Sequence, residues 1–124
     1  MIREINSKDW PEFCKRLTHE LKGATVKLET TKPDGLKETL ATEATFQGIA
    51  FEQVDGCSDA ITLRVRAERE IVHQMLDPIH VQLRASAAGA GDFNMLQIGS
   101  ESGVTIITLH PAVHAKMLDG LKAG

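Results

Sequence analysis

Histidines are the residues of this chain best suited to chemistry. His73 and His80 lie seven residues apart in the segment IVHQMLDPIHVQLRA, on either side of Asp77-Pro78. An imidazole can bind a metal or act as a general base near neutral pH. If Leu76 and Asp77 formed a two-residue turn, the two histidines would face each other across a hairpin, about 5 Å apart at Cβ. A wider corner between strands that do not pair fits the sequence equally well, because Leu-Asp is not a favoured hairpin turn.

A metal centre is the first chemistry to weigh, with His73, His80 and Asp77 as the candidate ligands. Zinc sites use three or four protein ligands, so two histidines supply at most half a site. His110 and His114 form a second pair, four residues apart, but no H-E-x-x-H or C-x-x-C motif accompanies either pair. Because both central histidines alternate with apolar neighbours, we expect their side chains to face solvent on a sheet. We therefore assign no cofactor.

Nucleophilic catalysis has less support. No serine lies in a G-x-S-x-G motif, and Cys57, in the loop segment DGCSD, has no neighbour that would lower its pKa. The glycine-rich segment AAGAGD precedes a predicted strand, whereas a phosphate-binding loop would precede a helix. We predict no catalytic residue and favour a protein that is not an enzyme.

A helix is the first element expected to position these residues. Asp9 can cap it, with Glu12 completing a capping box and Pro11 in the first turn, and Gly23 can end it. An apolar stripe recurs at helical spacing, formed by Trp10, Phe13, Cys14, Leu17 and Leu21. This stripe predicts a helix packed on a sheet. Trp10, Phe13 and Phe51 are our candidates for a small-ligand pocket between the two.

Strands follow the helix, because the apolar period changes from 3.6 to two. The segments that read as strands are 24–31, 36–42, 45–54, 60–67, 69–76, 78–85, 93–99 and 104–110. Gly35 and Gly103 suit turns, and Gly48 suits a bulge that would bend one long strand across two sides of the sheet. Residues 111–121 can close the chain as a short helix.

The elements together predict an α+β fold in a single domain over residues 1–124. We expect an N-terminal amphipathic helix packed on a strongly bent, mainly antiparallel sheet or small barrel of six to eight short strands.

The composition of the chain indicates which kinds of partner and which cellular location to expect. The chain has 14 basic and 17 acidic residues, and its basic residues are scattered rather than clustered, so we expect no nucleic-acid partner. No apolar stretch approaches the roughly 18 residues of a membrane span, and the N-terminal residues lack an export signal. Two cysteines make no disulfide scaffold, which favours reduced thiols and a cytoplasmic protein.

Several motifs spread over the chain carry a family resemblance. They are REI at 3–5, Trp10-Pro11 with Phe13, FQGIAFE, VHQMLDPIHVQL and LQIGSESGVTIITL. In these motifs the chain resembles a bacterial group of small proteins catalogued only as a domain of unknown function. The resemblance runs from Arg3 to about Pro111 and implies a small soluble bacterial protein. It implies no activity, cofactor or catalytic residue.

We expect a non-enzymatic protein-interaction or assembly module that binds a protein partner or forms a homodimer. The reason is that a short, strand-rich domain leaves strand edges uncovered. One alternative is a small-ligand sensor with its pocket near Trp10, Phe13 and Phe51. A further alternative is a metal-dependent enzyme that uses His73 and His80.

Overall fold

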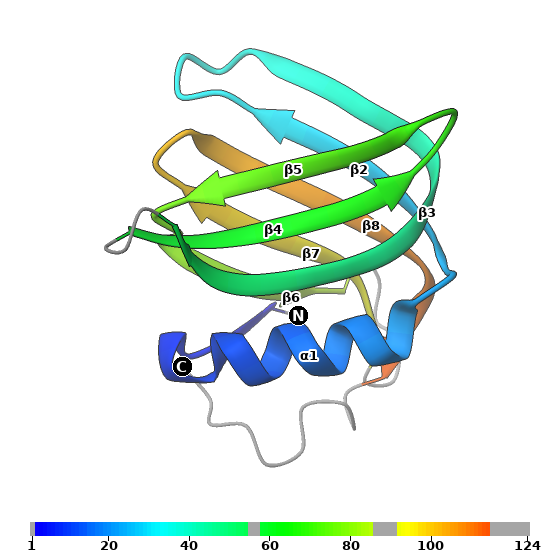
Figure 1. Ribbon diagram of the computed structural model, residues 1–124, viewed down its shortest axis with the longest axis horizontal. Coiled ribbons are helices and arrows are strands. Elements are labelled where there is room, and N and C mark those ends of the chain that lie inside the picture. Colours follow the sequence, from blue (N-terminus) through cyan, green and yellow to red (C-terminus); the bar gives the residue numbers. More distant parts are fainter. Residues whose placement is uncertain (1, 55–57, 86–91, 115–124) are drawn as a thin grey trace.

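One helix and one antiparallel sheet of eight strands make up the structure, a computed structural model that describes residues 2–54, 58–85 and 92–114 (Figure 1). The strand order in the sheet is β1-β6-β7-β8-β2-β3-β4-β5, and every pairing is antiparallel. The elements are β1 (Ile2–Glu4), a 3-10 turn (Ser7–Asp9), α1 (Trp10–Leu21), β2 (Thr25–Thr31), β3 (Lys37–Val54), β4 (Ser58–Arg66), β5 (Glu70–Leu76), β6 (His80–Arg84), β7 (Asp92–Ser100) and β8 (Gly103–His114). The predicted α+β class and strand number are confirmed.

Helix α1 buries the predicted apolar stripe, but it begins differently from our expectation. Asp9 makes no side-chain cap; instead Asn6 accepts a hydrogen bond from the Lys8 N–H in the 3-10 turn before the helix. The indole N–H of Trp10 donates to the Ile5 carbonyl (3.0 Å), which ties the start of the helix to the chain that leads into it. At the other end Gly23 takes the expected left-handed conformation, with φ +90°.

Strand β3 gives the sheet its shape. Its first half pairs with β2 and its second half pairs with β4 from Thr45 onward. A register shift between Phe46 and Gly48 confirms the predicted bulge, and a bulge bends the strand that carries it. In Figure 1 β3 curves from the layer that holds β2, β8 and β7 into the layer that holds β4 and β5. The sheet therefore folds over on itself, although β1 and β5 remain edges and no barrel closes.

The core lies between these two layers and against α1. Inward side chains of both layers are almost fully buried, including Leu28, Leu63, Met75, Ile107 and Leu96. They form one cluster with the apolar stripe of α1, which runs along one open side of the bent sheet (Figure 1). The sheet thus encloses its apolar face with the help of α1.

Two parts of the fold differ from the prediction made from the sequence. The short edge strand β1 was not anticipated, because three residues are too few to show a period of two. Strand β8 continues to His114, so the prediction that a helix begins at Pro111 is wrong: Pro111 lies in a strand. Residues 115–124, the loop with Cys57 and the alanine- and glycine-rich loop lie outside the described residues.

Candidate functional site

The second half of β3 has both of its edges covered. One edge pairs with β4, and the other meets α1 and the turn that follows it. The Thr18 hydroxyl donates to the Ile49 carbonyl (2.9 Å) and accepts from the Ile49 N–H (3.0 Å). Phe46 exchanges hydrogen bonds with the chain at Gly23 and Ala24 (2.9 and 2.8 Å). At the bulge, therefore, the helix and its turn satisfy backbone groups that a neighbouring strand would otherwise pair.

The first half of β3 has no such cover on its second edge. Residues Lys37–Ala44 pair with β2 on one side, and pairing with β4 starts only at Thr45. Strand β5 is likewise paired on one side, with β4. In the described part of the chain, neither edge has a strand beside it. Figure 1 shows β5 and the first half of β3 diverging from the β4–β5 turn. We call the space between Lys37–Ala44 and Glu70–Leu76 the seam.

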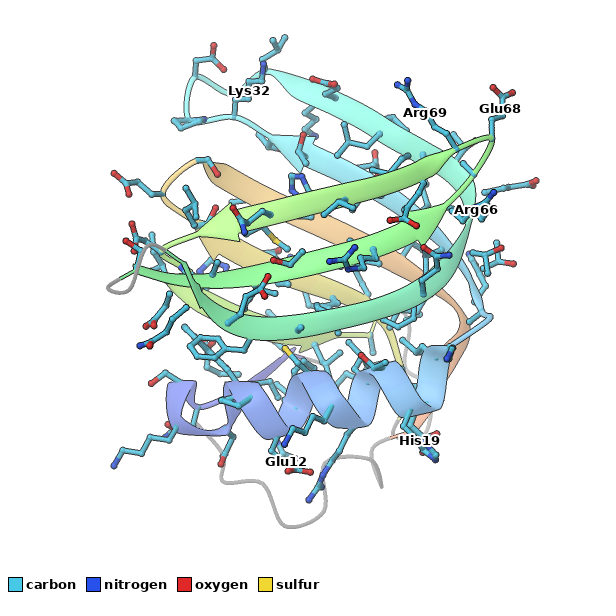
Figure 2. The ribbon with its side chains drawn as sticks, viewed as in Figure 1. Glu12, His19, Lys32, Arg66, Glu68 and Arg69 are labelled. Carbon is cyan, nitrogen blue, oxygen red and sulfur yellow. The ribbon has the colours of Figure 1, made fainter. Side chains whose placement is uncertain are left out.

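A wide concavity of about 940 Å³ lies at the closed end of the seam, and residues of both strands line it. Its floor is apolar: Leu40 and Ile71 are half-buried against the core, and Ala41 is buried in it. Its rim is charged, with Arg66, Glu68, Arg69 and Glu43. The first three of these project around the β4–β5 turn (Figure 2). With two cations and two anions, the rim has no net charge.

A smaller concavity of about 200 Å³ includes His73, farther along β5. The Nε2 atom of His73 lies 2.9 Å from Oγ1 of Thr105, a buried residue of β8. This contact links the two layers of the sheet. Burial lowers the pKa of His73 below its ordinary value, which favours the neutral form of the ring. The rest of the lining comes from the end of β2 and the turn after it, and from the start of β8 and the turn before it: Thr30, Thr31, Lys32, Ser102, Gly103, Val104 and Thr105.

The orientation of His73 corrects our expectation that it faces solvent. On β5, Ile71, His73 and Met75 share the inward face, while Val72 and Leu76 are exposed on the outward face. The expectation was wrong because the segment IVHQML has apolar residues at both parities. The alternation therefore did not show whether the odd- or the even-numbered residues of the segment face the core. The buried Met75 is the residue that marks the inward face.

His80 lies in a different environment from His73. Strand β6 pairs with β1 and β7 and not with β5, so the two histidines are not cross-strand partners. The His80 ring packs over Gly99, where an added Cβ would lie 2.2 Å from the ring carbon Cε1, and its Nε2 lies 3.2 Å from Nε2 of Gln97. Asp77 is exposed at the corner with φ +49°. Across the described ranges, no three His, Cys, Asp or Glu side chains gather to hold a metal.

The aromatic residues expected at a ligand pocket are packed against the core. Trp10 is 7% exposed and Phe13 is 1% exposed, and both belong to the core cluster, against which the half-buried Phe51 packs. The Trp10 and Phe51 rings lie 6.2 Å apart between centroids, tilted by 56°. None of the three lines either of the two concavities.

Two threonines matter for this arrangement although no sequence pattern marks them. Thr18 bonds a residue 31 positions away, and Thr105 contacts a residue 32 positions away. Neither carries a spacing signal, because both act through contacts that exist only once the sheet has folded over. Lone threonines in amphipathic segments are otherwise indistinguishable from surface residues.

Among the described residues, no helix has the length and apolar character needed to cross a membrane. Comparison with the curated proteins gave no match. Comparison with the solved structures gave none either. A family model, described as DUF5335, a family of unknown function, matches residues 1–117. This confirms the resemblance found in the sequence motifs: the chain belongs to the DUF5335 family.

Proposed function

We propose that this protein is a binding module that accepts an extended polypeptide segment as an added strand in the seam. One observation carries the proposal. Lys37–Ala44 and Glu70–Leu76 each have an edge without a partner strand among the described residues, and residues 40–43 of the first and Ile71 of the second line one shared concavity. Unpaired strand edges present backbone N–H and C=O groups that another strand can pair with.

Side chains around the seam suit such a strand on both of its faces. Its inward side chains would rest on the apolar floor formed by Leu40, Ala41 and Ile71. Its outward side chains would lie beside Val72 and Leu76, which are 50% and 42% exposed. Cross-strand neighbours of this kind contribute roughly 0.2–1 kcal/mol each, in addition to the backbone hydrogen bonds.

We assign the segment to a partner protein rather than to a second copy of this chain. The described strands of the chain already pack their apolar faces into its own core, so none is free to enter a second copy's seam. A homodimer remains an outcome of the test, and light scattering at high protein concentration would reveal it.

The setting we propose for this binding is the cytoplasm of a bacterium. Cys14 is a free, buried thiol, which suits a reducing compartment. The acidic balance of the chain argues for a polypeptide partner over a nucleic acid. The alternatives of a ligand pocket at Trp10 and a metal site at His73 and His80 have less support. Trp10 helps to fill the core, and the two histidines do not face each other.

Amide hydrogen exchange with a panel of eight-residue peptides that alternate an apolar residue with threonine tests the proposal. When a peptide binds, we expect slower exchange of the backbone amides of Glu70–Leu76 and Lys37–Ala44. Peptides whose alternate backbone nitrogens are methylated cannot donate hydrogen bonds along that edge, so they should not slow the exchange. Val72→Lys should weaken binding. Leu36→Lys should not, because this 58% exposed residue lies in the β2–β3 turn, outside the seam. Absence of slowed exchange in both edges at millimolar peptide would overturn the proposal.

A further inference from the structure

Three strand edges lack a partner strand within the described residues, and they differ in how well they are protected from pairing. Strand β1 is three residues long. The stretch Lys37–Ala44 has two register shifts in its pairing with β2 and carries charged side chains at Lys37, Glu38 and Glu43. Short edges, bulges and charged side chains all discourage the addition of another strand.

Strand β5 lacks these protections along most of its length. It has seven residues and keeps one register with β4 throughout. Its sequence EIVHQML contains no lysine, arginine or proline, and its one carboxylate, Glu70, is its first residue. Of the two edges of the seam, β5 is therefore the one that suits regular strand pairing.

Two hydrogen bonds at the end of β5 show which of its residues present backbone groups to the free edge. The Asp77 N–H donates to the Asp59 carbonyl of β4 (2.9 Å). On the opposite side, the Leu76 carbonyl accepts from the Glu101 N–H (3.4 Å), which closes the edge there. Because the backbone groups of successive residues alternate between the two sides of a strand, the even-numbered residues of β5 face the free edge.

From this arrangement we infer that the partner segment pairs with β5 through the backbone of Glu70, Val72 and Gln74. It carries one apolar side chain opposite Val72, with a polar side chain two positions away on each side. The inference rests on the proposed function and names the class of segment that the seam accepts.

The side chains of these three residues account for that pattern. All three lie on the outward, exposed face of β5. Directly opposed residues of paired strands place their side chains on the same face, within contact distance. Val72, which is 50% exposed, gains apolar contact from an apolar neighbour. The carboxylate of Glu70 and the amide of Gln74 gain hydrogen bonds from polar neighbours.

Amide exchange resolved by residue in NMR spectra tests the pairing. In the free protein, the amides of Val72 and Gln74 should exchange rapidly, and those of Ile71 and His73, which face β4, should exchange slowly. The probe is an eight-residue peptide of serine and threonine with a single central valine. At a free concentration ten times its Kd, it should slow the rapid pair about tenfold.

Fluorescence anisotropy tests which side chain lies opposite Val72. A second peptide differs from the first only in its central residue, which is Glu in place of Val. We expect the protein to bind the Val peptide about two- to fivefold more tightly. Val72→Lys should reverse this preference, because a lysine would then face the glutamate. The control Leu36→Lys adds the same charge in the β2–β3 turn and should leave the preference unchanged.

The outcomes separate the inference from the function on which it rests. Three results would overturn the inference and leave strand addition in the seam intact: slowed exchange confined to Lys37–Ala44, a preference for Val that survives Val72→Lys, or binding only of peptides in which every second residue is apolar. If no peptide of either kind slows exchange in either edge of the seam, strand addition itself fails and the inference fails with it.

Discussion

Replacing Thr18 by valine tests how the bent sheet is held against its helix. The substitution keeps the side-chain shape but removes the hydroxyl that bonds both the N–H and the carbonyl of Ile49. Leaving a buried polar group unpaired costs about 1–3 kcal/mol, and the site is half-buried, so water offsets part of this cost. For two such groups we expect Thr18→Val to lower the free energy of unfolding by about 2–4 kcal/mol.

Two control variants separate the hydroxyl from its surroundings. Thr18→Ser keeps the hydroxyl and loses one methyl group, which is worth about 1 kcal/mol. Gly48→Ala adds a methyl group 3.5 Å from Cγ2 of Thr18, an ordinary contact, so it should cost less than about 1 kcal/mol.

Urea unfolding provides the measurement, followed both by the fluorescence of the single tryptophan, Trp10, and by circular dichroism. Two results would refute the reasoning. One is a loss below about 0.5 kcal/mol for Thr18→Val, the lower limit for a single hydrogen bond. The other is a loss for Thr18→Ser as large as that for Thr18→Val.

Three further predictions follow from the packing and the titratable groups. Gly99→Ala should lower the free energy of unfolding in urea by about 1–3 kcal/mol, because the added Cβ would overlap the His80 ring. In the double variant, His80→Ala should relieve most of this loss. If the losses of the two single variants simply add in the double variant, the overlap is not their cause. Burial lowers the folded-state pKa of His73, so the unfolded chain binds the proton more readily and the melting temperature should fall as the pH drops below about 6.5. His73→Gln should reduce this dependence of the melting temperature on pH. An unchanged dependence in the variant would count against His73 as its cause. Burial raises the pKa of the Cys14 thiol to about 12, so in a Cys57→Ser background Cys14 should react with iodoacetamide only after unfolding; rapid labelling of the folded protein would disprove its burial.

Local patterns were enough to predict most of the elements. The apolar stripe from Trp10 to Leu21 located the helix, and alternation in segments such as 60–67 located strands and their inward faces. Glycine chemistry predicted the turns at Gly35 and Gly103, which have φ of +90° and +130°. The bend at Gly48 was also predictable, because Phe46 and Ile49 fall out of phase without a bulge.

The site itself was not predictable, because it depends on which strands fail to pair. The seam exists because β3 exchanges one partner strand for another at Thr45, and no residue type marks that exchange. The sequence did favour uncovered strand edges in general, from length and strand number. It did not identify β5 as one of those edges, and it directed attention to a His73–His80 pair that the strand order separates.

The position of β8 has a consequence for how the chain is synthesised. It is the last described strand, yet it lies in the interior of the sheet, between β7 and β2. In the described sheet it is the strand that joins the β2–β5 meander to the β6–β7 hairpin. Without residues 103–114, a nascent chain lacks the strand that pairs with both β2 and β7, so we expect the β2–β5 meander and the β6–β7 hairpin to stay unjoined. Completion of the fold must wait for the C-terminal strand, and until then the chain is most vulnerable to aggregation and to proteases.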